Sequence, residues 1–116
     1  MGVPADQDAI PTLLVSYENI VKHSKSYMNV YFTKTAKKEY EAWQKSSPKA
    51  VDKIEELISD IVENGLLAGK GKPEQLKYYK NPPKYSRHIT QADKLVYSPS
   101  GNDLLIISCK GHYNDK

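Results

Sequence analysis

Two segments in the middle of the chain carry apolar residues at the spacing of amphipathic helices. The first, KTAKKEYEAWQK, begins at Lys34. Ala36, Tyr40 and Trp43 recur along it every three or four residues and form one apolar stripe. Thr33 is a candidate N-cap, because its hydroxyl can accept a hydrogen bond from the first helical turn. The pattern predicts a helix whose Tyr40 and Trp43 side chains belong to the core.

The second segment, AVDKIEELISDIVEN, follows a break at SSP. Ser47 is a candidate N-cap, and Pro48 suits the first helical position, where its missing N–H leaves no hydrogen bond unmade. Gly65 can adopt the left-handed conformation that ends many helices. The two helices therefore form a hairpin, which must pack its apolar stripe against another element. The stripe residues of the second helix are Val51, Ile54, Leu57, Ile58, Ile61 and Val62.

Short alternating or apolar runs in the remaining chain predict strands. The alternation of YSRHIT places Arg87 on one face of its strand and His88 on the other. Residues 65–84, which are rich in Gly and Lys and close with NPPK, are predicted to be mostly loop. The predicted strands are NVYFT (29–33), YSRHIT (85–90), KLVYS (94–98) and DLLIISC (103–109).

A strand, two helices and an antiparallel meander, in that order, predict the α+β class. We expect a small twisted, mainly antiparallel sheet packed against an N-terminal two-helix hairpin. Residues 1–27 show no sustained period, and Met28 opens the first strand. The chain is therefore divided into an N-terminal extension of unknown role, residues 1–27, and a single domain, residues 28–116.

Composition and charge narrow the classes of function. Residues 66–116 hold eight Lys and one Arg against four acids, so this half can attract phosphate groups or an acidic protein. No run approaches the roughly 20 apolar residues of a membrane span. The N-terminus also lacks a signal-peptide pattern, so we expect a cytoplasmic protein without a membrane partner. The single cysteine, Cys109, lies in an apolar run and is predicted to be a core residue.

Several chemistries are not indicated by the sequence. The three histidines and the one cysteine show no metal-ligand spacing, so neither a metal nor another cofactor is expected. GKGKPE does not match a nucleotide-binding phosphate loop. A helix-turn-helix interpretation of residues 34–65 would bring an acidic helix against DNA phosphates.

The basic half does hold the groups that metal-free RNA cleavage requires. That reaction needs a base for the 2′-OH proton, a cation for charge on the phosphate and an acid for the leaving 5′-oxygen. Glu74, the one acid in GKGKPEQLK, can be the base. His112 can be the acid, because histidine can hold a proton near neutral pH. An exposed tyrosine could stack on a nucleobase, and the candidates are Tyr85, Tyr97 and Tyr113.

Each of these groups also has an ordinary structural interpretation. A lone glutamate among lysines is usually a solvated ion, and a histidine close to a C-terminus is usually a surface residue. Lys94, next to a turn, can be a strand charge that deters aggregation. The residues by themselves therefore indicate a small basic α+β domain with RNA as a candidate ligand.

From Met28 to Tyr113 the chain resembles the YoeB/Txe family of RelE-like toxins from bacterial toxin–antitoxin pairs. The resemblance rests on EAWQ, KIEELISDI, GKGKPEQLK, YSRHIT, KLVY, LLIISC and the terminal GHY. It implies a RelE-like toxin fold and a metal-independent endonuclease that cleaves mRNA in the ribosomal A site and inhibits translation. The implied partners are the 70S ribosome with its mRNA and a cognate antitoxin of the YefM/Axe type, and a homodimer is a further candidate assembly.

The resemblance also implies a role for individual residues. Glu74 and His112 take the positions of the general base and the general acid. Lys94 takes the position of the cation that stabilises the pentacovalent phosphate. The positions expected to contact RNA are Lys70, Lys72, Lys77, Arg87, His88 and Tyr113.

Three departures from the family's pattern bear on activity. His88 stands where the family usually has a second arginine. Lys94 replaces an arginine and keeps the charge without the planar bidentate fork, and Asp93 adds a negative charge beside it. Three residues, NDK, follow Tyr113, where family members commonly stop. Two alternatives to a fully active nuclease therefore stay open: a weakened or inactive antitoxin- or ribosome-binding module, and a nuclease damped in cis by residues 1–27.

Overall fold

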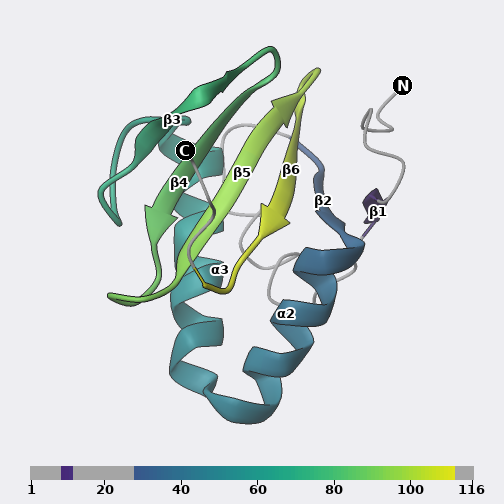
Figure 1. Cartoon of the computed structure of the whole chain (residues 1–116), viewed down its shortest axis with the longest axis vertical. Helices are drawn as coiled ribbons and strands as arrows, with labels where there is room; N and C mark the ends of the chain where they lie inside the picture. The colour runs from purple at the N-terminus through teal and green to yellow at the C-terminus, as the bar shows by residue number, and fades with distance from the viewer. Residues whose placement is uncertain (1–8, 12–27, 112–116) are drawn as a thin grey trace.

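The computed structural model describes residues 9–11 and 28–111, which form a six-stranded sheet with two helices against one face (Figure 1). The strand order is β1-β2-β6-β5-β4-β3. β2 and β6 run parallel, and the other neighbouring strands pair antiparallel. The predicted α+β class and the two-helix hairpin are confirmed. The elements are β1 (Ala9–Pro11), β2 (Val30–Thr33), α2 (Lys34–Ser46), α3 (Pro48–Asn64), β3 (Glu74–Lys80), β4 (Pro83–His88), β5 (Lys94–Ser100) and β6 (Asp103–Ser108).

The helices begin and end where local side-chain chemistry predicts. The Thr33 hydroxyl accepts a hydrogen bond from the Ala36 N–H at 3.0 Å, and Ser47 caps α3 in the same way. Pro48 occupies the first turn of α3. Gly65 follows the last turn with a φ of 103°, which favours glycine. Within the described residues neither helix is long and apolar enough to cross a membrane.

One hydrophobic core lies between the hairpin and the sheet. The apolar stripe of α3 packs there with residues of β2, β5 and β6. Tyr40 is buried with its ring edge against Phe32, and Trp43 packs half-buried at the margin of the core. Cys109 is fully buried, which raises the pKa of its thiol. The predicted core roles of Tyr40, Trp43 and Cys109 are thus confirmed.

The prediction that residues 65–84 are mostly loop is wrong for their second half. β3 occupies Glu74–Lys80 and forms one edge of the sheet. Its sequence lacks clear alternation because only Leu76 of the seven residues is buried. The register also shifts between Gln75, opposite Tyr85, and Lys80, opposite Pro83. The strand forms because β4 supplies a hydrogen-bonding partner, and its own sequence shows no strand period.

The N-terminal extension contributes a short strand at the other edge of the sheet. β1 pairs antiparallel with β2, with Ile10 opposite Phe32. β2 and β3 are separated by β6, β5 and β4, so β1 and the strand of Glu74 lie at opposite edges (Figure 1). The division of the chain at Met28 stays a prediction, because residues 12–27 lie outside the described part.

Candidate functional site

The sheet register brings three of the predicted functional residues to one face. Glu74 lies opposite Ser86, and His88 lies opposite Lys94. Directly opposed residues share a face, as do residues two apart in one strand, so Glu74, His88 and Lys94 lie on the same side. Arg87 alternates with His88 and contacts α3, which assigns the three to the face away from the helices. Glu74 is exposed, and His88 and Lys94 are half-buried.

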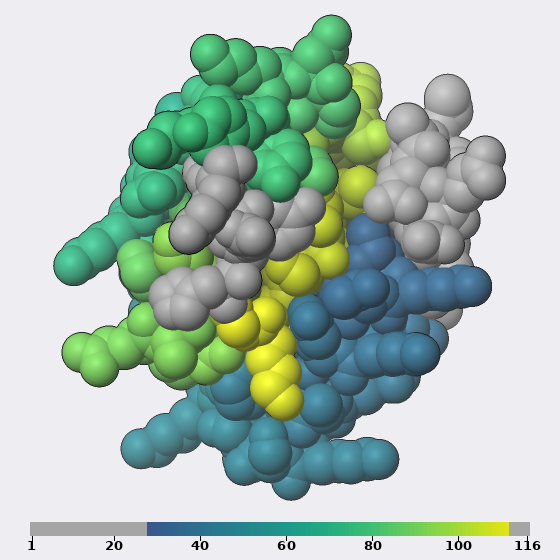
Figure 2. All heavy atoms as spheres, in the orientation of Figure 1, coloured from purple at the N-terminus to yellow at the C-terminus, as the bar shows by residue number. Residues whose placement is uncertain are grey.

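The end of the described chain is held beside Lys94. The Lys94 N–H donates to the Gly111 carbonyl at 3.0 Å, and the Gly111 N–H donates to the Asp93 carboxylate at 2.7 Å. In Figure 2 the yellow end of the described chain lies between the light-green β4–β5 side and the blue α2. Asp93 therefore has a structural partner, although the sequence by itself indicates only an unfavourable charge beside Lys94.

His112 and Tyr113 lie outside the described residues, so their assigned roles stay predictions. The chain nevertheless reaches His112 directly from Gly111. Glu74, Lys94 and Gly111, the last of which precedes the predicted acid, thus come from β3, β5 and the segment after β6. These elements lie together only in the folded sheet.

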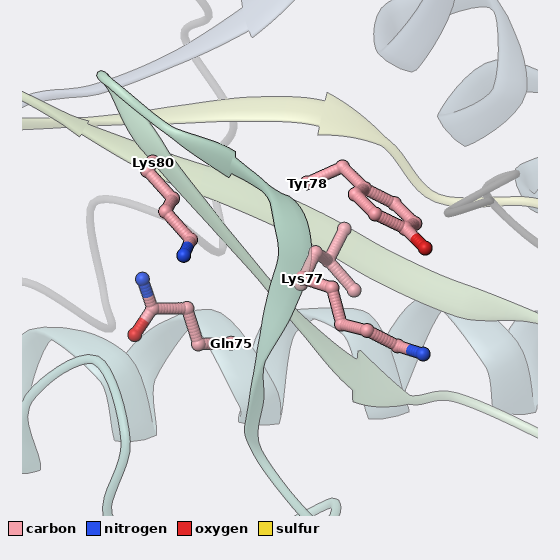
Figure 3. Close-up of a pocket in the computed structure, with 5 residues that line it drawn as sticks. Gln75, Lys77, Tyr78 and Lys80 are labelled. Carbon is pink, nitrogen blue, oxygen red and sulfur yellow. The ribbon is translucent and has the colours of Figure 1, made fainter.

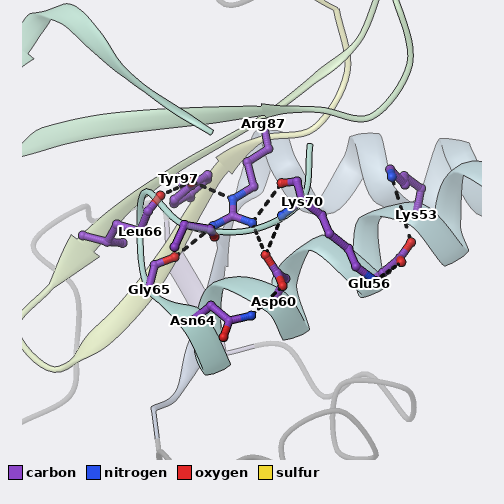
Figure 4. A network of polar contacts seen from close by, with 10 residues as sticks. Lys53, Glu56, Asp60, Asn64, Gly65, Leu66, Lys70, Arg87 and Tyr97 are labelled. Atoms are coloured by element: carbon purple, nitrogen blue, oxygen red, sulfur yellow. Dashed lines mark hydrogen bonds and ion pairs between the residues drawn. The ribbon is translucent and has the colours of Figure 1, made fainter. Parts of the chain in front are cut away.

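The structure contradicts the expectation that Arg87 contacts RNA. Its side chain is fully buried. All five N–H groups of the guanidinium are engaged within the protein (Figure 4). Arg87 instead attaches the loop between α3 and β3 to the sheet. Its partners, at 2.5–3.0 Å, are the Tyr97 hydroxyl, the Asp60 carboxylate and the carbonyls of Gly65, Ala68 and Lys70.

Asp60 completes this hub from α3. Partial burial opposes its ionisation, but hydrogen bonds from the Lys70 N–H and the Arg87 guanidinium outweigh it and lower the pKa of Asp60. A Cβ at Gly69 would lie 1.9 Å from the Asp60 carboxylate, and φ there is 103°. The loop can therefore pass over Asp60 only with glycine at this position, which accounts for the first glycine of GKGKPE.

Two of the three candidate stacking tyrosines are unavailable to RNA. Tyr85 and Tyr97 are buried and stack on each other, with ring centroids 5.8 Å apart. Tyr97 donates its hydroxyl proton to the Leu66 carbonyl at 2.6 Å, and burial raises its pKa. Tyr97 therefore supports the loop between α3 and β3, and of the three candidates Tyr113, outside the described residues, keeps the stacking role as a prediction.

Basic residues line two hollows whose lining includes chain neighbours of Glu74. The larger, about 940 Å³, runs along β3 between Lys77, Tyr78 and Lys80 (Figure 3). The smaller, about 470 Å³, is lined by Lys53 of α3 together with Lys72 and His88. Along the chain Glu74 follows Lys72 and precedes Gln75, which lines the larger hollow. The predicted RNA contacts of Lys72, Lys77 and His88 are compatible with this placement and stay predictions.

Lys70 forms an exposed ion pair with α3. The exposed Lys70 ammonium lies 2.6 Å from Glu56 of α3, and the hydrogen bond between them lowers the pKa of Glu56. The RNA contact expected for Lys70 also stays a prediction. Among residues 9–11 and 28–111 no group of three or more His, Cys, Asp or Glu could hold a metal ion.

Comparisons with known proteins identify the class and then the family. The fold alone is shared with a chain of an Escherichia coli DinJ–YafQ complex, at 18% identity and a TM-score of 0.60, over 74% of this chain and 94% of that one. The model of the YoeB-like toxins of bacterial type II toxin-antitoxin systems matches residues 32–113. The chain is therefore a toxin of a type II toxin–antitoxin system. Within that class it belongs to the YoeB family.

Individual relatives support this assignment. Toxin YoeB of Escherichia coli K12 is 37% identical over 86 residues, which cover 74% of this chain and the whole relative. Toxin YoeB of Streptomyces coelicolor is 35% identical over the same length. The YoeB dimer from Staphylococcus aureus matches with a TM-score of 0.68 at 42% identity, covering 74% of this chain and 98% of that one. A YoeB–YefM complex from the same organism gives a TM-score of 0.66.

Proposed function

We propose that this toxin is a ribosome-dependent endonuclease that cleaves mRNA in the A site and thereby inhibits translation in the cytoplasm. The observation that carries the proposal is the shared sheet face of Glu74, His88 and Lys94, with Gly111 held beside Lys94. Family membership makes a ribonuclease the natural candidate, and the position of the described groups is compatible with it.

The chemistry requires only side chains. Glu74 removes the proton from the 2′-OH, and the 2′-oxygen attacks the adjacent phosphorus. Lys94 stabilises the charge that builds on the phosphate oxygens. The bond to the 5′-oxygen breaks as His112 supplies a proton to that oxygen. The products are a 2′,3′-cyclic phosphate and a 5′-hydroxyl, and no metal takes part.

We further propose an antitoxin of the YefM type as the protein partner, and the homodimer as a candidate state of the free toxin. The relatives solved as a YoeB–YefM complex and as a YoeB dimer support these assignments. Lys77 and Lys80 give the β3 edge a positive surface that an acidic antitoxin segment could cover.

The test is cleavage of an mRNA placed in the A site of purified 70S ribosomes, with the product ends identified. Glu74→Gln should lose most activity, since one transferring group contributes about 10²–10⁴-fold. Glu63→Gln is the matched control, because Glu63 is also an exposed acid but lies at the end of α3. Cleavage that leaves a 2′,3′-cyclic phosphate and depends on Glu74 supports the proposal.

Ribosome binding without cleavage by the wild-type chain would instead favour the alternative, a binding module that has lost the nuclease. His88 and Lys94, each of which stands where the family usually has an arginine, are the residues in its favour. Asp93 gives this alternative less support than its place beside Lys94 in the sequence suggests. Its carboxylate already accepts hydrogen bonds from the Gly111 N–H and the Thr90 hydroxyl.

A further inference from the structure

We propose that Glu39 and Trp43 of α2, together with Asp93, form a clamp that positions His112 for its role as general acid. The clamp is defined as these three side chains around residues 109–111. The proposal rests on the proposed nuclease function, and it assigns a part in the reaction to Glu39 and Trp43 of α2, for which the sequence by itself predicted only a helix with Trp43 in the core.

The clamp replaces strand pairing where β6 has ended. β6 ends at Ser108, and the following backbone groups find side-chain partners. Glu39 accepts a hydrogen bond from the Cys109 N–H at 2.7 Å, and the Trp43 indole N–H donates to the Cys109 carbonyl at 2.7 Å. Two residues further on, Asp93 accepts from the Gly111 N–H at 2.7 Å. Both backbone groups of Cys109 and the N–H of Gly111 are therefore fixed from outside the sheet.

The two helix residues are suited to act together. Glu39 and Trp43 are four apart in α2, so their side chains lie on one helix face. Partial burial raises the pKa of Glu39, although the hydrogen bond from the Cys109 N–H and the positive charge of Lys110 act to lower it. An acid is thus held half-buried at the margin of the core, where an apolar residue would pack at lower cost. The Lys110 ammonium also lies 5.7 Å from the centre of the Trp43 ring.

Holding this segment matters because His112 is the next residue after Gly111. A general acid must come within about 2.6–3.2 Å of the oxygen that it protonates. A displacement of about 1 Å can lower a reaction rate about 10²-fold. Glu39, Trp43 and Asp93 do not touch the reacting atoms in this scheme. They are positioning residues that act through His112.

The experiment uses the full chain on 70S ribosomes under single-turnover conditions. Glu39→Ala and Trp43→Phe should each lower the cleavage rate by about 10–100-fold with A-site binding unchanged. Glu39→Gln should retain most activity, because its amide oxygen can still accept from the Cys109 N–H. Glu41→Ala is the matched control, since Glu41 is an exposed acid on the same helix. Circular dichroism establishes that each variant is folded.

A modified mRNA separates positioning of the acid from general damage. A sulfur in place of the leaving 5′-oxygen needs little protonation, so it should restore the rates of Glu39→Ala and His112→Ala toward that of the wild type. It should not restore Glu74→Gln, which lacks the base. In addition, Glu39→Ala combined with His112→Ala should be no slower than His112→Ala alone.

Two results would overturn the clamp while leaving the nuclease intact. One is an equal loss of rate by Glu39→Ala on the oxygen and sulfur substrates. The other is a double variant that is slower than His112→Ala by the full factor of Glu39→Ala. If Glu39→Ala fails to fold, Asp93→Ala provides the same comparison from the opposite side of the segment. Failure of the nuclease itself would show differently, as absence of cleavage by the wild-type chain.

Discussion

Replacing Arg87 is the most direct test of the loop hub that the structure shows. Arg87→Lys keeps the charge, but one ammonium cannot supply the five directed N–H groups of the guanidinium. Removing one partner of a buried ion pair costs about 3–5 kcal/mol. We expect the lower end, about 3 kcal/mol, because the lysine keeps a positive charge and Asp60 keeps its hydrogen bonds from the Lys70 N–H and Asn64. Water can also reach the exposed residues Gly65 and Ala68.

A loss of this size is large against the usual 5–15 kcal/mol of a domain, so it is readily measured. Urea unfolding can be followed by the emission of Trp43, the single tryptophan. Lys80→Met, which changes an exposed lysine on β3, should alter the free energy of unfolding by less than about 0.5 kcal/mol. A cycle that pairs Arg87→Met with Asp60→Asn should give a coupling energy above about 1 kcal/mol.

The opposite pattern would refute the structural role of Arg87. If Arg87→Lys unfolds at the same urea concentration as the wild type but binds the mRNA-programmed ribosome more weakly, the guanidinium reaches RNA. The original expectation from the sequence would then be right, and the buried hub would be wrong.

Three further predictions follow from the site and the sheet. Lys94→Arg should raise the single-turnover cleavage rate, because a bidentate fork suits a phosphate better than a point charge; an unchanged or lower rate would count against the role of Lys94. The lowered pKa of Asp60 stabilises the fold above about pH 4, the unfolded value, and this stability is lost as the pH falls through the folded value. Acid titration of unfolding should therefore show a smaller pH slope for Asp60→Asn than for the wild type. A chain that starts at Met28 should cleave as fast as the full chain, since β1 lies at the edge opposite β3; faster cleavage would establish inhibition in cis by residues 1–27.

The sequence by itself determined the helical hairpin and much of the core. Helix periodicity and caps involve residues within a few positions of one another, as in the hydrogen bond from the Ala36 N–H to Thr33. The motif residues Glu74 and Lys94 could also be named from the chain, and the strand alternation correctly separated Arg87 from His88. These features depend on local geometry, which the order of residues specifies directly.

The tertiary structure decided which of those residues face the candidate site. Arg87 is a cation like Lys94 in the sequence, but its partner Asp60 lies 27 positions away on α3 and takes it into the interior. Glu39 carried no signal beyond its spacing from Trp43, since its partner Cys109 is 70 positions distant. β3 required the free edge of β4 for its hydrogen bonds. In each case the deciding contact joins residues far apart in the chain, and such contacts exist only once the core has brought the helices and the sheet together.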